Sequence, residues 1–300
     1  MTLFMDRALA ERLDAALVAE GVAYVAAWRR CRPEDEPALR RMGGGCLLFT
    51  GADSPVTQAV GLGMAGPVSD ADLEAMERFF VGRAATPRVT VNPMAHPSLV
   101  QGLRRRGYVL EDFEGALVCS LNPEQSRTCT PAGPVATPAT VSPPGQARTP
   151  LEPPRELTIR RVGAEDVAIW APTIARGFEG LQPGTRPGRM ELTLAEVALN
   201  IEFAESYLAE VDGAAAGGGS LAIHDGIATC FGDATLPEFR GRGVQSALLR
   251  HRLARGAEAG CDLAAAGAAP GNGSQRNMER LGFRVAYTVV MLTCQSYPRA

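Results

Sequence analysis

Apolar residues recur along the chain with two spacings, one typical of strands and one typical of helices. Both spacings are clearest in the second half. Short runs of alternating or continuous apolar residues predict strands, and longer runs with apolar residues three and four positions apart predict helices. The predicted elements from residue 156 onward are, in order, strand 156–162, helices 164–180 and 192–204, strands 206–213, 214–226 and 227–237, a helix ending near Gly260, strand 261–269, helix 273–282 and a β segment over 283–295. This order predicts an α/β (α+β) layout with a mixed sheet.

The first half repeats a shortened version of the same order. Ser69 and Asp72 form a predicted capping box at the start of a helix over 69–84. The other predicted elements are strands 45–51, 57–64 and 87–93, helix 96–107 and a β segment over 108–121. Residues 93–118 and 270–292 both run from a proline through a short helix and a glycine–aromatic pair into a long β segment. We therefore predict an internal duplication.

Between the two halves, residues 122–154 have the composition of a linker. Nine of these thirty-three residues are proline and none is aromatic. Proline removes backbone hydrogen-bond donors, and so few apolar groups cannot offset the entropy of ordering the segment. The sequence thus predicts one domain at 1–121 and a second at 155–300. A proline-rich ligand for a partner domain is the alternative interpretation of the linker.

The composition narrows the classes of function. The formal net charge is −3 and 46% of the residues are hydrophobic, which argues against a disordered chain and against a nucleic-acid binder with a basic surplus. The seven cysteines are scattered without a C-x-x-C pair, so no metal site is expected. No apolar run approaches the roughly 18–20 residues that span a bilayer, and the first residues lack the apolar region of a signal peptide. We expect a cytoplasmic protein that binds neither membrane nor nucleic acid.

Residues 236–256, LPEFRGRGVQSALLRHRLARG, carry the strongest chemical signal. Gly241 and Gly243 let the backbone turn tightly before a helix, whose first N–H groups lack intrahelical partners and carry about half a positive charge from the macrodipole. Arg240 and Arg242 add charge at the rim, so the turn is predicted to bind a phosphate or pyrophosphate. Neither the P-loop motif nor the dinucleotide motif occurs at this turn. An ordinary strand-to-helix turn with solvated arginines is the alternative.

These residues resemble the GNAT superfamily of acyl-CoA-dependent N-acyltransferases. Its central signature, [Q/R]-x-x-G-x-[G/A] after the fourth strand, matches residues 240–245 except that Gln245 replaces a small residue. Its later signature, an Asn or Ser region leading into a short helix and Gly-Phe, resembles GNGSQRNMERLGF at 271–283. The resemblance implies two GNAT-like domains, each a mixed, mostly antiparallel twisted sheet flanked by helices. The first domain would be degenerate, because its turn has no arginine.

The resemblance also implies the ligand and its contacts. Acetyl-CoA would be a co-substrate, without a metal, and one molecule would bind per chain. The residues implied to bind it are Thr235 and Leu236 at the pantetheine arm, Arg240, Gly241, Arg242, Gly243, Val244, Gln245 and Ser246 at the pyrophosphate, and Ser274 and Asn277 at the outer part of the cofactor. An N-cap role for Ser274 and a solvated Asn277 are the simpler alternatives.

Acyl transfer from a thioester to an amine needs a neutral nucleophile and a proton for the departing thiolate. The family often supplies that proton from a tyrosine four residues before the glycine of the Gly-Phe pair, where this chain has Met278. Tyr287 is a candidate replacement, although a core position is the alternative for a tyrosine in an apolar strand. The candidate bases are Glu202, Asp233 and Glu179, and a positioned water is the alternative to all three.

The sequence therefore predicts an N-acetyltransferase that moves an acetyl group from acetyl-CoA to an amine by direct attack. The acceptor, a small molecule or a peptide, and the oligomeric state correspond to no recognisable motif. The missing tyrosine motivates a second hypothesis, a non-catalytic acyl-CoA-binding or regulatory protein, and the turn alone motivates a third, a nucleotide- or phosphate-binding module. Glycines 217–219 precede no helix and are interpreted as a bulged or closely packed strand.

Overall fold

One continuous sheet of eleven strands forms the centre of the protein. The computed structural model describes residues 5–122 and 156–294, and the strand order across the sheet is β1-β2-β3-β4-β11-β5-β10-β9-β8-β7-β6. Among the described strands, the neighbours β3 and β4 and the neighbours β9 and β10 are parallel, and all other neighbouring strands are antiparallel. The predicted mixed, mostly antiparallel sheet flanked by helices is confirmed.

The strands are β1 (Ala38–Met42), β2 (Gly45–Phe49), β3 (Gln58–Val60), β4 (Arg88–Val91), β5 (Tyr108–Ser120), β6 (Leu157–Val162), β7 (Ala204–Val211), β8 (Ala214–His224), β9 (Ile227–Thr235), β10 (Leu263–Ala268) and β11 (Arg284–Cys294). The α-helices are α1 (Arg7–Cys31), α2 (Asp70–Val81), α3 (Pro97–Arg105), α5 (Val167–Glu179), α6 (Arg189–Ala198), α7 (Val244–Glu258) and α8 (Gly273–Arg280). Three short 3₁₀ helices are η1 (Pro33–Asp35), η2 (Ala164–Asp166) and η3 (Pro237–Phe239).

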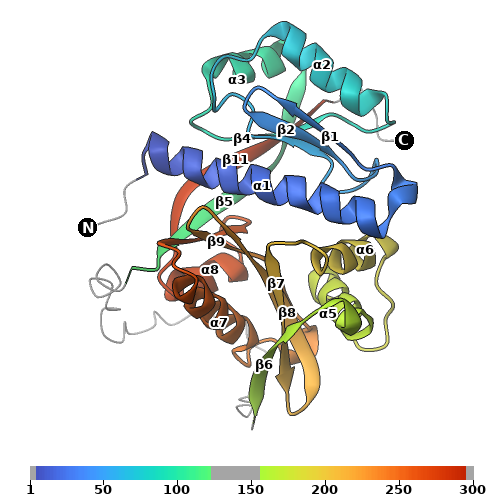
Figure 1. The fold of residues 1–300 in the computed structure, drawn as a ribbon, viewed down its shortest axis with the longest axis vertical. Coiled ribbons are helices and arrows are strands. Elements are labelled where there is room, and N and C mark those ends of the chain that lie inside the picture. Colours follow the sequence, from blue (N-terminus) through green and yellow to red (C-terminus); the bar gives the residue numbers. More distant parts are fainter. Residues whose placement is uncertain (1–4, 123–155, 295–300) are drawn as a thin grey trace, which may run out of the picture.

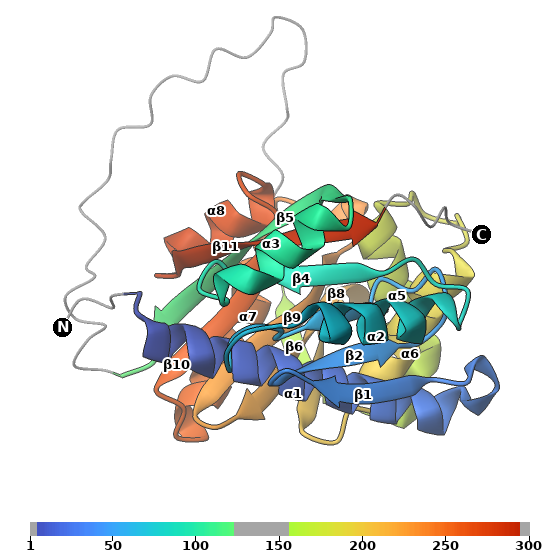
Figure 2. The same cartoon turned by 90° about the horizontal axis from the view of Figure 1, so that it is seen from above.

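The last strand of each half pairs with the penultimate strand of the other half. β5, from the first half, lies beside β10, with Gly115 opposite Ala268. β11, from the second half, lies beside β4, with Val290 opposite Val91, and β5 and β11 also pair with each other. Figure 2 shows β11 in red between β4 and β5. Each half therefore completes the sheet of the other.

Helix α1 packs against both halves of the sheet and crosses the middle of the molecule (Figure 1). Toward the first half, Val18 and Val25 join a buried cluster with β2 and β3. Toward the second half, Trp28 packs with residues of α6 and β9, and its indole N–H donates to the Asp35 carboxylate at 2.9 Å. The opposite face of the second half carries α7, whose Leu248 and Leu249 are buried against β9 and β10.

Three details differ from the sequence expectations. Strand β1 was not predicted, because the two arginines in ALRRM interrupt its apolar alternation. The helix expected over 192–204 lies earlier, at Arg189–Ala198, and β7 already begins at Ala204. The predicted proline-rich linker, apart from Asn122, lies outside the described residues. None of the described helices has the length and apolar character needed to cross a membrane.

Candidate functional site

Strands β9 and β10 separate partway along their length and open a notch in the sheet. They pair in parallel from Leu263 opposite Ile227 to Ala266 opposite Cys230, and the pairing stops there. Residues 231–235 of β9 continue beside β8 alone, and Gly267 and Ala268 continue beside β5. Backbone groups on the free edge of β9 are thus available to a ligand that lies along the notch.

The turn after β9 presents a helix start without any cap of its own. Gly241 and Gly243 have φ values of +80° and +82°, in the left-handed region that favours glycine. Helix α7 has no acidic residue in its first turn and no side-chain cap. The first intrahelical hydrogen bond runs from the Ala247 N–H to the Gly243 carbonyl at 2.9 Å, which leaves the N–H groups of residues 244–246 for a ligand. The uncapped helix start that the predicted anion site requires is therefore present.

Notch and turn open into one cavity of about 1100 Å³. Nine of the eleven predicted cofactor residues line this cavity: Thr235, Arg240, Gly241, Gly243, Val244, Gln245, Ser246, Ser274 and Asn277. Arg240 also ties the turn to α5, because its guanidinium donates to the Gly177 carbonyl at 3.1 Å and to the Thr235 carbonyl at 3.3 Å. An elongated anionic ligand fits a cavity with a free strand edge at one end and uncapped N–H groups at the other.

Two of the predicted cofactor residues lie outside the wall of this cavity. Leu236 is 3% exposed, and its N–H donates to the Ala216 carbonyl at 3.0 Å. The Arg242 guanidinium lies 5.5 Å from the centre of the Phe239 ring. Both side chains thus pack against the protein around the turn rather than facing the cavity.

Gln245 links the first turn of α7 to α8. Its side-chain amide donates to Ser274 Oγ at 2.8 Å and accepts from Asn277 Nδ2 at 2.7 Å. The N-cap of α8 is Asn272, whose side chain accepts from the Gln275 N–H, so Ser274 does not cap this helix. The position where Gln245 departs from the small residue of the signature therefore holds together two walls of the cavity.

Replacing Gln245 by alanine is expected to weaken acetyl-CoA binding by up to about 30-fold. Two hydrogen bonds that fix α8 against the turn would be lost, and a net hydrogen bond contributes about 1 kcal/mol. Isothermal titration calorimetry measures the change, with Arg250→Ala on the exposed side of α7 as the control. An unchanged affinity would show that α8 needs no link to the turn.

Asp233, a predicted base, lies in the cavity wall but is held by a buried arginine. Arg252 has 0% of its side chain exposed and Asp233 has 11%, and the two terminal nitrogens of the guanidinium donate to the carboxylate. The same guanidinium donates to the Ser220 carbonyl at 2.9 Å. Although burial opposes its charge, the Asp233 carboxylate raises the pKa of Arg252. The carboxylate of Asp233 is therefore already engaged in an ion pair.

Glycines 217–219 make room for close packing, as interpreted from the sequence. A methyl group on Gly219 would meet the guanidinium of Arg252, and one on Gly218 would meet Trp170 at 2.6 Å. Opposite them, β9 is bulged between Phe231 and Ala234, with Gly232 at a φ of +65°. The bulge directs the Asp233 side chain to Arg252.

The remaining catalytic candidates do not line the cavity. Glu202 is 81% exposed and pairs with Arg30 at 3.2 Å. Glu179 accepts from the Gly188 N–H. Tyr287 packs with α1 at the apolar cluster around Val118, where burial raises the pKa of its hydroxyl and the charge of Asp14 adds to the shift. The structure brings none of the three to the notch.

The match to a family model decides what this site belongs to. Residues 178–283, which contain the notch, the turn and α8, match the acetyltransferase (GNAT) family. These residues belong to the GNAT family. No curated protein shows significant sequence similarity to the chain.

Solved structures are similar to the fold of most of the chain, beyond the GNAT domain alone. A GCN5-related N-acetyltransferase from Kribbella flavida is 18% identical, with 93% of this chain and 95% of that chain covered and a TM-score of 0.59. A tandem GNAT protein from the clavulanic acid biosynthesis pathway is 17% identical, with coverages of 88% and 85% and a TM-score of 0.54. At these sequence identities the similarity is one of fold, and the matched regions include both halves of this chain.

The first half repeats the elements of the GNAT domain but closes the helix start that would receive a ligand. β3, α2, β4 and α3 follow one another as β9, α7, β10 and α8 do. The predicted capping box is confirmed, since Ser69 Oγ accepts from the Asp72 N–H at 3.1 Å and the Asp72 carboxylate accepts from the Ser69 N–H at 2.9 Å.

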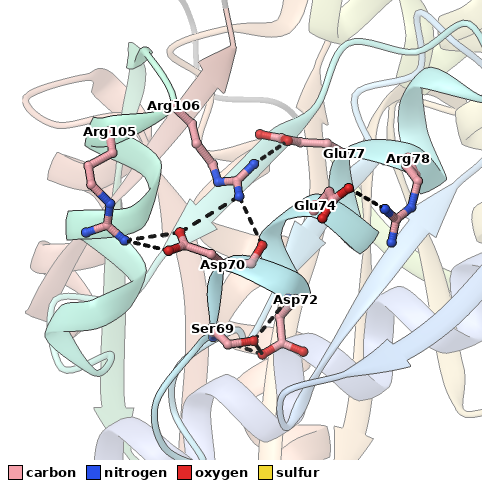
Figure 3. Close-up of polar contacts among 8 residues, drawn as sticks. All are labelled: Ser69, Asp70, Asp72, Glu74, Glu77, Arg78, Arg105 and Arg106. Carbon is pink, nitrogen blue, oxygen red and sulfur yellow. Dashed lines mark hydrogen bonds and ion pairs between the residues drawn. The ribbon is translucent and has the colours of Figure 1, made fainter.

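Figure 3 shows that the two carboxylates in the first turn of α2 are also engaged. Arg105, at the end of α3, donates to the Asp70 carboxylate at 3.1 Å, and Arg106 donates to the Asp70 carbonyl at 3.0 Å. Hydrogen bonding by Ser69 lowers the pKa of Asp72, so the Asp72 carboxylate in this turn stays ionised at neutral pH. A phosphate would meet like charge at α2 and free N–H groups at α7.

Proposed function

We propose that the protein is an N-acetyltransferase that transfers an acetyl group from acetyl-CoA to an amine. The observation that carries the proposal is the continuity of the cavity, which joins the uncapped start of α7 to the splayed edge of β9. The N–H groups of residues 244–246 would receive the pyrophosphate, and the edge of β9 would hold the pantetheine arm. The GNAT match at residues 178–283 supports this assignment.

In this proposal residues 155–300 form the catalytic domain and residues 1–121 a GNAT-like domain without a cofactor turn of its own, joined by a linker at 122–154. One acetyl-CoA binds per chain, because the first turn of α2 is capped and acidic. Free thiols at all six described cysteines support a reducing compartment such as the cytoplasm. The acceptor is a small-molecule or peptide amine.

Departure of the thiol does not require a protein acid at Met278. Met278 is 2% exposed and lines the cavity without a proton to give. A thiol with a pKa of about 8.5 leaves as a thiolate near neutral pH far more readily than an amine or alcohol does. The described part of the cavity wall contains no tyrosine, so the proposal assigns protonation of the thiolate to solvent.

Calorimetry and thiol release together test the proposal. Acetyl-CoA is expected to bind with a micromolar or lower Kd, and adenosine nucleotides are expected to bind at least about 10-fold more weakly because they lack contacts along β9. Thiol release is then followed across alkylamines, arylamines, aminoglycosides, amino acids and peptides. Binding without thiol release from any amine would favour the acyl-CoA-binding protein suggested by Met278. No binding of acetyl-CoA would overturn the proposed function.

A further inference from the structure

Two carboxylates from the first half lie near the deep end of the notch without partners. Glu114 is on β5 and lines the cavity, and Glu20 is on α1, near enough for the charge of Glu114 to act on it. Among the described residues, neither carboxylate accepts a hydrogen bond or forms an ion pair. The other acidic side chain in the described wall of the cavity, Asp233, is paired with Arg252. Two unpaired carboxylates of the first half at a cavity of the second half are candidates for binding a ligand.

The strand exchange places Glu114 in the site of the second half. Because β5 lies beside β10, Ala116 is opposite Gly267, and Gly115 is opposite Ala268. The Glu114 carboxylate covers Gly267 so closely that a methyl group on this glycine would clash with it. Val118, four residues along β5, packs against α1. Glu114 therefore lies on the face of the sheet that α1 covers, opposite the face that carries α7.

The position along the notch matches the reactive end of an extended ligand. Gly267 directly follows Ala266, the last residue of β10 that pairs with β9. The turn that would hold the pyrophosphate lies at the other end of residues 231–235. A pantetheine arm that runs from the turn along the free edge of β9 ends where the two strands meet, beside Glu114.

The local electrostatics favour the protonated form of Glu20. Burial raises the pKa of Glu20 to about 7, and the charge of Glu114 adds to this shift. The pKa of Glu114 is also raised, first by desolvation among its neighbours and then by Asp112, although the side chain is open to the cavity. The Glu20 carboxyl is therefore the member of the pair with a pKa near neutral pH.

No arginine among the described residues forms an ion pair with either carboxylate. The titratable and charged groups near the pair or elsewhere around the cavity are Asp112 on β5, Tyr24 on α1, Cys230 and Asp233 on β9, Arg252 on α7 and Arg280 on α8. Tyr24 donates its hydroxyl to the Leu194 carbonyl at 2.6 Å, and Arg252 is engaged by Asp233. Arg280 donates to Asn277 Oδ1 at 2.9 Å. The negative charge of Glu20 and Glu114 is therefore left for a ligand.

We propose that Glu114 binds and deprotonates a primary alkylammonium acceptor, and that Glu20 is a positioning residue that acts through Glu114. This inference rests on the proposed acetyl-CoA-dependent function and names its acceptor class. The first half, without a cofactor turn of its own, supplies the acceptor chemistry of the second.

The reaction balances with the groups named. A proton moves from the R–NH₃⁺ acceptor to the Glu114 carboxylate. The neutral nitrogen then forms a C–N bond to the thioester carbonyl carbon, and the C–S bond breaks with the electron pair leaving on sulfur. The second nitrogen proton is lost to solvent, the thiolate takes a proton from solvent, and the carboxylic acid releases its proton. The products are R–NH–CO–CH₃, CoA–SH and H⁺.

Kinetics of Glu114→Gln and Glu20→Gln test the roles. With alkylamine acceptors such as spermidine, cadaverine and kanamycin, E114Q is expected to lower kcat/KM by about 10²–10⁴-fold, and E20Q by less. An arylamine such as aniline, already neutral at pH 7, should be acetylated at similar rates by all three proteins. The pH profile supplies the second readout: kcat/KM of the wild type rises through the apparent pKa of the pair, whereas that of E114Q keeps rising toward the pKa of the amine.

Controls separate this inference from the proposed function. Glu11 lies on α1 in an exposed ion pair with Arg7. Glu11→Gln should therefore acetylate amines with the kcat/KM of the wild type. Acetyl-CoA affinity should be unchanged in E114Q and E20Q, since neither touches the turn. If acetyl-CoA does not bind the wild type, the proposed function fails. If it binds but alkylamines are not acetylated, or are acetylated equally by E114Q, the inference is overturned while cofactor binding stands.

A measurement without any acceptor tests the carboxylate pair directly. Carbon-13 NMR of glutamate carboxyl groups follows the titration of Glu20 in the wild type and in E114Q. Removing the charge of Glu114 is expected to lower the pKa of Glu20, because less repulsion opposes its ionisation. An unchanged Glu20 titration would show that the two side chains act independently and would remove the positioning role of Glu20.

Discussion

Replacing Asp233 by alanine is expected to lower the free energy of unfolding by about 3–5 kcal/mol. The variant leaves Arg252, a fully buried guanidinium, without its counter-ion in the centre of the second half. The remaining hydrogen bonds to the Ser220 and Leu248 carbonyls do not neutralise the charge. Urea denaturation followed by circular dichroism measures the loss.

A surface pair provides the matched control for Asp233. Arg12 and Asp262 are also joined by two hydrogen bonds, at 2.6 and 3.0 Å, but their side chains are 42% and 58% exposed. Asp262→Ala is therefore expected to cost about 1 kcal/mol or less. The double variant Asp233→Ala/Arg252→Met should recover part of the lost stability. A full loss of turnover in Asp233→Ala with unchanged stability would instead return Asp233 to the role of base.

Replacing Gly243 by valine is expected to raise the Kd for acetyl-CoA by about 100-fold or more. Gly243 has a φ of +82° and no atom near its Cβ position, so the substitution introduces backbone strain rather than a clash. A β-branched residue leaves the left-handed region, which turns the N–H groups of residues 244–246 away from the cavity. Loss of two charge-assisted hydrogen bonds, about 1.5 kcal/mol each, gives the expected factor.

Gly260 offers a control with the same backbone strain. It has a φ of +80°, no atom near its Cβ position, and a location beyond the other end of α7. Gly260→Val should lower stability about as much as Gly243→Val and leave the Kd unchanged. Equal binding of acetyl-CoA by the Gly243 variant and the wild type would place the anion site elsewhere.

Local sequence patterns were sufficient for most elements and for the turn. Residues 240–246 form a continuous stretch whose glycines and helix start depend on neighbours in sequence, so the anion-binding geometry could be predicted. The strand exchange could not. β5 and β11 have similar patterns because the halves are similar, and nothing local specifies which penultimate strand each one joins.

The same limit applies to the side chains around the notch. Glu114 and Glu20 reach the site through the exchange and through α1, so neither carried a motif. Arg252 did leave a signal, since it follows Leu248 by four residues and therefore lies on the buried face of α7. A charge at such a position indicates a buried partner, and Asp233 supplies it. The prediction of Asp233 as a candidate base did not take this ion pair into account.

The exchanged strands also set the order in which the protein can fold during synthesis. When the first half has left the ribosome, β4 has an unpaired edge, because its neighbour β11 is made only after the whole second half. β5 at that stage has neither β10 nor β11 beside it. Until Arg284–Cys294 is inserted between them, the nascent chain exposes strand edges that are prone to pairing with other chains. Contacts between residues as distant in sequence as Val91 and Val290 thus make closure of the sheet a late and slow step.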